Sequence, residues 1–258
     1  MKIIIAPAKK MVVDTDTFAC EGRPQYLDRT QLILDRLRQL SYPEAKVLWH
    51  CSDKLAQPNY DWLHQLDLTR QLTPTLLAFS GIQYQYMAPD LFTAPALNYV
   101  RTNLRILSGF YGILRPFDGV VPYRLEMQSR LPVADAPNLY AFWGSQLYQA
   151  LTPTPEPIIN LASREYAKTI TPYLAPNQPF VTVTFGSLVA GKLKTKATLA
   201  KMARGEMVRF LAERQAQHLN DVAAFNHPDW AYAPERSTPD NFVFIYQKTA
   251  NSHSPKNL

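Results

Sequence analysis

The stretch Lys2-Ile3-Ile4-Ile5-Ala6-Pro7 stands near the start of the chain, and the fold class follows from it. Its three isoleucines make a short, β-branched apolar run that Pro7 brings to an end. Such a run predicts a buried strand that leads into a loop. Lys9 would then lie just past the end of this strand.

Helical patterns follow this first strand. Over residues 26–40, apolar residues recur at steps of three and four, with charged residues in the gaps, as in an amphipathic helix. Ser41 is placed to cap a second helix that runs to about residue 51. Pro43 stands early in that helix, and Glu44 comes three residues after the serine.

Strands and helices alternate along the rest of the chain. Helices are predicted over 59–66, 74–79, 89–99 and 138–151, and strands over 104–107, 157–161, 180–185 and 242–246. This order predicts an α/β (mixed α+β) fold in which a mixed sheet is surrounded by helices. No G-x-G-x-x-G or G-x-x-x-x-G-K-[ST] motif follows any strand, so no standard nucleotide-binding fold is indicated.

One large domain is expected over residues 1–248. The chain has 258 residues, 47% of them hydrophobic, and is long enough to bury a large core. The extended stretch 152–157 is the only internal candidate for a linker, and it is too short to require a second domain. Residues 249–258 are polar and lack periodicity, so we expect a disordered tail there.

A cytoplasmic location is expected. The apolar run 3–6 is far too short for a signal sequence or a membrane span. Cys20 and Cys51 lie 31 positions apart and match no disulfide framework, so we expect free thiols in a reducing compartment. A peroxide-sensing role for either thiol stays open beside the simpler role of a partly buried structural cysteine.

The formal net charge of +6 is unevenly distributed. Residues 1–100 carry 10 basic and 10 acidic side chains, whereas residues 101–214 carry 14 basic and 7 acidic ones. A solvated positive face would account for any such excess. Its concentration in one segment favours an anionic partner, either nucleic acid or a phosphate-bearing ligand.

Gly109 and Gly112 stand three residues apart between apolar flanks, and Arg115 follows them. These glycines predict a tight turn whose amide groups could approach a phosphate, as in hairpins that hold a nucleic-acid backbone without reading bases. A plain turn between a strand and a helix explains the same two glycines, and both interpretations stay open here.

The segment 122–130 contains three charged candidates, Arg124, Glu126 and Arg130. Alternate side chains of an extended segment point the same way, so Arg124 and Glu126 would share a face. Either the two form a simple ion pair, or the carboxylate orients Arg124 toward a phosphate, which its forked guanidinium suits well.

A helix with cations on one side is predicted over residues 195–215. At 100° per residue, four cations fall within one arc: Lys194, Lys201, Arg204 and Arg209. The opposite arc is apolar, and the two glutamates of the segment lie outside the basic arc. We expect an exposed basic face that meets an anion, with a merely solvated helix face as the alternative.

Ser163 follows a predicted strand and stands where it can cap a helix. Helix N-termini attract anions through their free N–H groups and their dipole, and Lys168 would add a full charge nearby. Ser163 could equally act as a cap alone. Glu126 and Glu165 are assigned to supporting ion pairs.

The chain contains none of the catalytic or metal-binding sequence motifs that we considered. The five histidines are scattered, no H-E-x-x-H or H-x-C cluster occurs, and no G-x-S-x-G nucleophile elbow exists. We therefore assign no catalytic residue, no metal site and no cofactor. Paired carboxylates for acid–base chemistry could still meet in space, because spacing in the sequence does not decide that.

Several short motifs occur in order along the chain: Ala6-Pro7-Ala8-Lys9, Ser52-Asp53-Lys54-Leu55-Ala56, Ser108-Gly109-Phe110-Tyr111-Gly112-Ile113-Leu114-Arg115-Pro116, Pro122-Tyr123-Arg124-Leu125-Glu126-Met127, Phe142-Trp143-Gly144, Asn160-Leu161-Ala162-Ser163 with Glu165-Tyr166 and Lys168, and the segment 201–210. Together they resemble the YaaA family over residues 1 to about 248. Several motifs in a fixed order are far more specific than any one of them.

The resemblance implies a cytosolic bacterial protein that is induced by hydrogen peroxide and limits oxidative damage and unincorporated iron. It also implies binding of duplex or distorted DNA, largely independent of sequence, by a helix-hairpin-helix-like element. The best match to that element here is the turn from Gly109 to Gly112. Basic residues within the family's motifs would line a positive cleft: Lys9, Lys54, Arg124, Lys168 and Arg204.

The leading hypothesis is a peroxide-stress protein that binds DNA through a basic cleft, with no membrane and no obligate protein partner. The alternative is an enzyme that holds a phosphorylated small molecule or nucleotide in the same cleft. Lys9, Arg124 and Lys168 would then hold the phosphate, and Glu126 or Glu165 would act as acid or base.

Cleft shape discriminates between these hypotheses. An open groove wide enough for a duplex favours the DNA-binding protein, and a closed pocket with convergent polar groups favours the enzyme. A third possibility, a stress factor that interacts only with proteins, predicts a sizeable exposed apolar patch instead.

Overall fold

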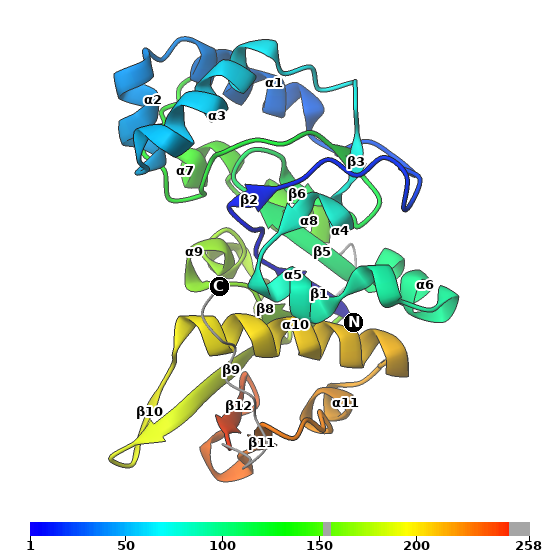
Figure 1. Ribbon diagram of the computed structural model, residues 1–258. Coiled ribbons are helices and arrows are strands. Elements are labelled where there is room, and N and C mark those ends of the chain that lie inside the picture. Colours follow the sequence, from blue (N-terminus) through cyan, green and yellow to red (C-terminus); the bar gives the residue numbers. More distant parts are fainter. Residues whose placement is uncertain (152–155, 248–258) are drawn as a thin grey trace.

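The computed structural model describes residues 1–151 and 156–247, and the centre of this part of the chain is a mixed sheet of eight strands (Figure 1). Seven strands follow the order β11-β12-β9-β8-β1-β5-β6, and β10 pairs with β9. The five inner strands are parallel, while β6 and β11 at the edges are antiparallel to their neighbours. The strand bounds are β1 Lys2–Ile5, β5 Leu104–Ser108, β6 Gly112–Leu114, β8 Ile158–Leu161, β9 Phe180–Val189, β10 Lys192–Lys194, β11 Trp230–Tyr232 and β12 Asn241–Tyr246.

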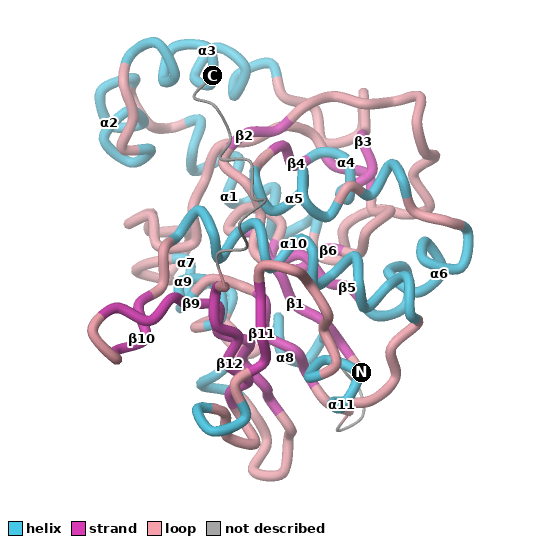
Figure 2. Tube along the Cα trace, turned by 60° about the horizontal axis from the view of Figure 1, so that its bottom comes forward, coloured by secondary structure: helices cyan, strands magenta, loops and turns pink. Residues whose placement is uncertain are grey.

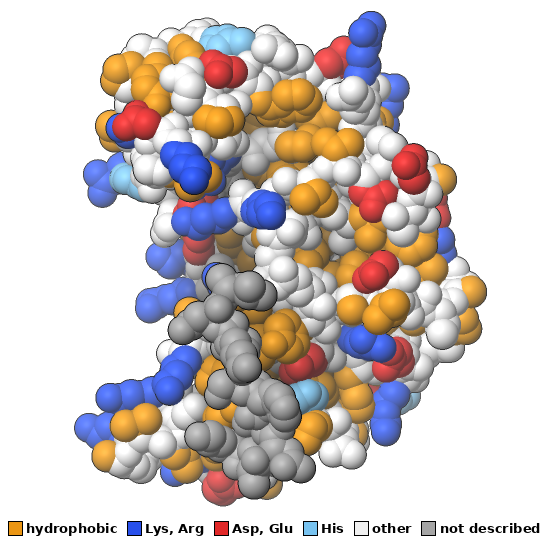
Figure 3. All heavy atoms as spheres, viewed as in Figure 1, with side chains coloured by type: hydrophobic (Ala, Val, Ile, Leu, Met, Phe, Trp, Pro, Cys, Tyr) orange, Lys and Arg blue, Asp and Glu red, His pale blue; other side chains and the backbone are white. Residues whose placement is uncertain are grey.

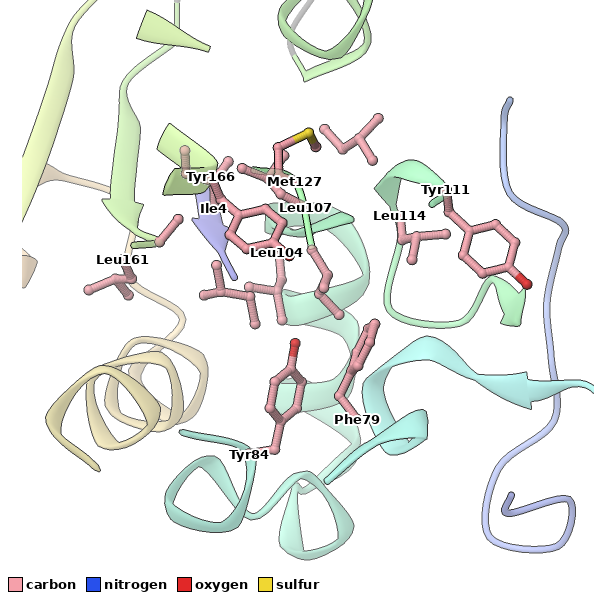
Figure 4. Packing of buried hydrophobic residues seen from close by; sticks show 14 of the residues in the cluster. Ile4, Phe79, Tyr84, Leu104, Leu107, Tyr111, Leu114, Met127, Leu161 and Tyr166 are labelled. Atoms are coloured by element: carbon pink, nitrogen blue, oxygen red, sulfur yellow. The ribbon is translucent and has the colours of Figure 1, made fainter. Parts of the chain in front are cut away.

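The isoleucine run forms β1, which has β8 on one side and β5 on the other. Ile3, Ile4 and Ile5 are fully buried, so the predicted buried strand is confirmed. Parallel strands are covered on both faces, which explains why successive rather than alternate side chains are apolar. In Figure 4, Tyr84 lies below and Tyr166 above the side chains contributed by β1 and β5.

Helices cover both faces of the sheet and build a separate layer at one end. That layer, at the top of Figure 1, contains α1 Leu27–Arg38, α2 Tyr42–Trp49 and α3 Asp53–Gln65. The other helices are α4 Thr75–Ala78, α5 Ile82–Met87, α6 Ala94–Asn103, α7 Leu139–Trp143, α8 Gln146–Leu151, α9 Arg164–Ala167, α10 Ala197–Arg214 and α11 Leu219–Ala223. Single 3-10 turns lie at Pro89–Leu91, Thr171–Tyr173 and Pro234–Arg236, and short strand pairs join β2 Lys10–Met11 to β4 Phe79–Ser80 and β3 Thr73–Pro74 to β7 Gly119–Val120.

Each stretch predicted as helical contains helix, but the ends differ, and the stretches 89–99 and 138–151 are each divided into two pieces. The backbone N–H of Ser41 donates to Glu44 Oε2 at 2.8 Å, as the capping box requires. That helix ends at Trp49 because His50 adopts a left-handed conformation, with φ of 45°. The helix predicted over 138–151 is two helices, since Gly144 leaves the helical region with φ of 51°.

The stretch that contains Gly109 and Gly112 is a β-hairpin, so the helix-hairpin-helix-like element expected there is wrong for this position. β5 and β6 pair antiparallel, with Ser108 opposite Gly112. The aromatic side chains of the turn, Phe110 and Tyr111, are buried, and both of their amides donate to Ser108 Oγ. Burial of these rings draws the turn into the core, where its N–H groups are used internally.

A second hairpin, β9–β10, projects from the body of the molecule (Figures 1 and 2). Its turn is made by Ala190 and Gly191, which both have positive φ, 49° and 74°. Such a two-residue turn is typical of tight hairpins. β9 therefore continues four residues beyond the strand predicted over 180–185, and Leu188 and Val189 near its end are 44% and 43% exposed.

Buried hydrophobic residues from α1 to β12 belong to one continuous core, in agreement with a single mixed α/β domain. Two predictions fall on residues outside the described ranges: the tail at 249–258, and most of the extended stretch at 152–157. Among the described helices, none is both long and apolar enough to cross a membrane.

Candidate functional site

β1 and β8 are neighbouring strands whose following segments leave in opposite directions. Ile5 at the end of β1 lies opposite Leu161 at the end of β8. From β1 the chain passes toward β5 on one side, and from β8 it passes toward β9 on the other. In open α/β sheets such a reversal opens a crevice outside the carboxyl ends of the two strands, and ligands bind there.

A cavity of about 470 Å³ lies at this position. Its walls are the loop after β1, the start of α5, the extended segment 123–126, the start of α9, and Lys201 with Arg204 of α10. The size is within the range of roughly 300–1,000 Å³ that is usual for small-molecule sites. We call this cavity the switch-point pocket.

Specific contacts fix the loops that form the rim of this pocket. The Tyr84 hydroxyl donates to the carbonyl oxygen of Ala6 at 3.1 Å. Gly81 lets α5 approach the same loop, because a Cβ at this position would lie only 2.9 Å from the Cβ of Ala8. On the other wall, the N–H of Ala162 donates to Asn160 Oδ1 at 3.0 Å and turns the chain after β8.

Positive charge predominates in the pocket. The cations along its walls are Lys9, Lys10, Arg124, Lys201 and Arg204, against the two carboxylates Glu126 and Glu165. The three lysines are exposed at the rim, whereas the two arginines are half-buried. Burial lowers the pKa of Arg204, but a guanidinium still carries its charge at neutral pH.

Three residues that line the pocket each carry a buried hydrogen-bond donor without a partner. These donors are the Nε atoms of Arg124 and Arg204 and the Nε2 atom of Gln83. Gln83 is only 6% exposed, so solvent offers little compensation. Leaving a buried donor unpaired costs about 1–3 kcal/mol, and more for a charged group. These three unpaired donors belong to residues around one cavity.

The two carboxylates of the pocket differ in their surroundings. Glu126 Oε1 accepts from Lys9 Nζ at 2.5 Å. Glu165 Oε1 accepts from the backbone N–H of Gln128 at 3.1 Å. Burial, together with the negative charge of Glu126, raises the pKa of Glu165 above that of an ordinary glutamate. Glu165 is therefore the group in the pocket best placed to take up or release a proton.

Six of the residues predicted from the sequence come together here: Lys9, Arg124, Lys201, Arg204, Glu126 and Glu165. Burial alternates along residues 121–129, so Arg124 and Glu126 share a face of an extended segment as predicted. The ion pair differs from the simple interpretation, because Glu126 pairs with Lys9 rather than with Arg124.

The single basic face predicted for residues 195–215 is divided in the structure. α10 begins at Ala197, so Lys194 belongs to β10 instead. Arg204 is turned inward to the pocket, and its expected exposure is wrong. Arg209 lies at the surface, where its Nε donates to Glu213 at 2.7 Å. The cause is that α10 packs against α5, α6 and β9 and leaves little of its circumference in water.

The other predicted residues lie outside the pocket. Arg115 holds Asp118 at 2.9 Å, and Arg130 lines a second cavity beside α2. Lys54 and Lys168 are exposed, in the first turn of α3 and at the end of α9. Gly109 and Gly112 form the buried hairpin described above. In the described part of the chain, no group of three His, Cys, Asp or Glu side chains is placed to hold a metal ion.

Sequence reasoning missed two lining residues that matter, Lys10 and Gln83. Lys10 directly follows Lys9 after the first strand, and this adjacency could have identified it. Gln83 lies in α5, a helix of six residues that is too short to show periodicity, so no sequence signal pointed to it.

Comparison with known proteins agrees with this arrangement. A family model described as peroxide stress protein YaaA matches residues 1–236. The chain belongs to the YaaA family. The resemblance inferred from short sequence motifs is thereby confirmed.

Curated relatives in the YaaA family match along nearly their whole length. A protein of Lactiplantibacillus plantarum is 68% identical over 247 residues, which is 96% of this chain and all of the relative. One from Pediococcus pentosaceus is 54% identical over 245 residues, covering 95% and 98% of the two chains. One from Agathobacter rectalis is 46% identical over 244 residues, covering 95% and 98%. All three carry the name UPF0246 protein.

Proposed function

We propose that this protein acts in the cytoplasm during peroxide stress, and that it binds DNA through a basic surface centred on the switch-point pocket. Membership of a family described by peroxide stress supports the first part. The observation that carries the second part is the excess of five cations over two carboxylates in a concave site whose three lysines are exposed at the rim. Phosphate contacts by such cations provide affinity that is largely independent of base sequence.

The β9–β10 hairpin extends this surface. Lys192, Lys194 and Lys196 are all exposed, and no acidic residue occurs between β9 and Glu206. Figure 3 shows Lys and Arg side chains gathered along the hollow margin of the molecule from which the hairpin projects. A positively charged arm beside a positively charged pocket fits a polyanion longer than the pocket itself.

Anisotropy titration of a labelled duplex across a salt series tests the DNA-binding proposal. We expect affinity to fall steeply with salt, because counterions are released when lysines contact phosphates. Lys194→Ala and Lys201→Ala should each weaken binding to every duplex sequence alike and lower the slope of log K against log salt concentration by about 1.

Arg70→Ala is the matched control, because it removes one exposed cation outside the pocket and the hairpin. An equal loss in this control would assign the effect to net charge alone. A duplex affinity that does not depend on salt concentration, or that neither lysine substitution changes, would refute the proposed surface.

An enzyme acting on a phosphorylated small molecule or nucleotide is the second candidate. One observation favours it: Glu165 has a raised pKa and lies in a concave pocket whose cations could hold a phosphate. Product analysis after incubation with nucleotides, with Glu165→Gln beside the parent protein, tests this. Turnover that the variant loses would support the enzyme, and no product under any condition would reject it.

A further inference from the structure

We propose that the switch-point pocket holds a single nucleotide unit by its phosphate, an unpaired or terminal nucleotide of a DNA strand or a free nucleotide, while duplex DNA stays on the outer surface. The part of this inference that concerns a nucleotide within a DNA strand rests on the proposed function. It names the chemical unit that enters the pocket and the donors that receive it.

The unpaired donors identify the phosphate position. Arg124, Arg204 and Gln83, each with one buried unpaired donor, come from three separate elements and line the one cavity. A phosphate carries several acceptor oxygens and a negative charge, so it can accept from all three and neutralise part of the charge of the two arginines. The guanidinium fork suits this geometry better than a lysine would.

A close contact between two helices lies next to two of these residues. Gly205, the residue after Arg204, lies so near α5 that a Cβ there would be 2.1 Å from the carbonyl oxygen of Gln83. Only glycine permits this approach, which brings the backbone of α10 at Gly205 against that of α5 at Gln83. The phosphate position is thus built by the packing of α10 on α5 and does not depend on flexible surface side chains.

The remaining wall is suited to a sugar and a base. Tyr84, Tyr123, Tyr166, Ile82 and Leu125 line the same cavity. Burial raises the pKa of all three tyrosines, so their hydroxyl groups stay protonated at neutral pH. The hydroxyl groups of Tyr84 and Tyr123 already bond Ala6 and Ser108, so a sugar and base would meet a largely apolar wall, as is typical of small-molecule sites.

The depth of the donors excludes a duplex from the same position. Gln83 is 6% exposed, and the two arginine Nε atoms are buried. The backbone of a paired duplex lies on a wide, convex surface, which cannot enter a cavity of about 470 Å³ to meet buried groups. A nucleotide that is unpaired or lies at a strand end can enter, because no partner strand holds it in the stack.

Calorimetric titration with deoxyadenosine 5′-monophosphate, deoxyadenosine and inorganic phosphate tests the assignment on the free ligands. We expect the monophosphate to bind best, since it alone supplies both phosphate and base. Gln83→Leu, which keeps the size of the side chain, should weaken it about tenfold or more, the fold-change expected when a hydrogen bond to a charged group is lost. Arg204→Met should do the same.

Two controls lie on the same helices. Gln85→Leu changes an exposed glutamine two positions along α5, and Arg209→Met changes a surface arginine of α10 that bonds Glu213. Both should bind the monophosphate as the parent protein does. The thermal midpoint of each variant is measured in parallel, so that loss of binding is scored only in folded protein.

A second titration compares the affinity for a fully paired duplex with the affinity for the same duplex carrying a short 5′-phosphorylated overhang. We expect Gln83→Leu to abolish the preference for the overhang and leave duplex affinity unchanged. Intact duplex binding with no monophosphate binding and no Gln83 effect would overturn this inference and leave the proposed function standing.

The opposite outcome is equally distinct. Monophosphate binding that needs Gln83 and Arg204, in a protein that does not bind duplex or overhang, would support the pocket assignment with a free nucleotide as its source and would refute DNA binding. Inorganic phosphate that binds as tightly as the monophosphate would overturn the assignment of a nucleotide.

Discussion

Glu165 is half-buried in the switch-point pocket beside a second carboxylate, Glu126, and burial raises its pKa. A carboxylate whose pKa is raised in the folded state is protonated more readily there than in the unfolded chain. The folded state therefore suffers no penalty from this group below the unfolded pKa, near 4.3. The penalty develops as pH rises through the folded pKa, so stability is lost toward neutral pH.

Replacement of Glu165 by Gln should consequently stabilise the protein at neutral pH. We expect the thermal midpoint to rise by about 2–4 °C at pH 7.5, the size of about 1 kcal/mol for a chain of this length. The gain should vanish near pH 4, where the parent protein is protonated at this position. Calorimetric scans at both values check this. A gain of equal size at pH 4 would show that ionisation of Glu165 is not its cause.

The pocket residues that could be predicted from the sequence are charged side chains that lie in or next to a segment whose strand or helix pattern is clear. Lys9 follows the isoleucine strand, and Arg124 lies in a segment of alternating burial. Gln83 could not be identified, because a neutral side chain in a helix of one and a half turns has neither charge nor periodicity to mark it. Its importance arises only from its burial without a partner.

Among the elements, α10 and α5 form the contact on which the pocket depends. Gly205 stands in the interior of α10, where a change to alanine ordinarily stabilises a helix by about 0.5–1 kcal/mol. Here the added Cβ would lie 2.1 Å from the carbonyl oxygen of Gln83 and 2.8 Å from the N–H nitrogen of Met87. Both are backbone atoms, so the two helices must move apart.

Gly205→Ala should therefore destabilise the protein, opposite to the usual sign. We expect a loss of about 1–3 kcal/mol, typical of an overpacked core, and a fall of roughly 2–12 °C in the thermal midpoint. Thr198→Ala, at an exposed position of the same helix, should change the midpoint little. An unchanged or raised midpoint for Gly205→Ala would mean that the helix contact is looser than described.

Element-level prediction succeeded where one residue pattern decides the local structure. The capping box of α2 and the amphipathic pattern of α1 are local, and both are confirmed. The hairpin at Gly109 was predicted as a turn for binding nucleic acid, yet contacts with Trp143 and the segment 125–127 bury it. These contacts link residues far apart in the chain, so they are invisible in a short stretch of sequence.

For the whole molecule, the pocket draws on five segments that lie between Ala6 and Arg204. No partly unfolded form can hold its ligand, since loss of any one segment opens the pocket. A bound nucleotide at 100 times its Kd should then stabilise the native state by about 2.7 kcal/mol. The single thermal transition should rise by roughly 5–10 °C as one step.

Differential scanning calorimetry with and without the monophosphate measures this shift. Gln83→Leu should show no shift under the same conditions, and Gln85→Leu should show the full one. Splitting of the transition into two peaks on addition of ligand would contradict the view that the pocket unites the whole domain.

The same distribution of segments has a consequence for synthesis on the ribosome. Ala6 emerges early, but β8 is complete only at residue 161, and α10 supplies its arginine only at residue 204. At 5–20 residues per second, the nascent chain carries exposed lysines for roughly ten to forty seconds before the pocket can close. Products of stalled translation would thus keep the positive charge of the early segments and lack the means to select a ligand, a capacity that only the nearly finished polypeptide acquires.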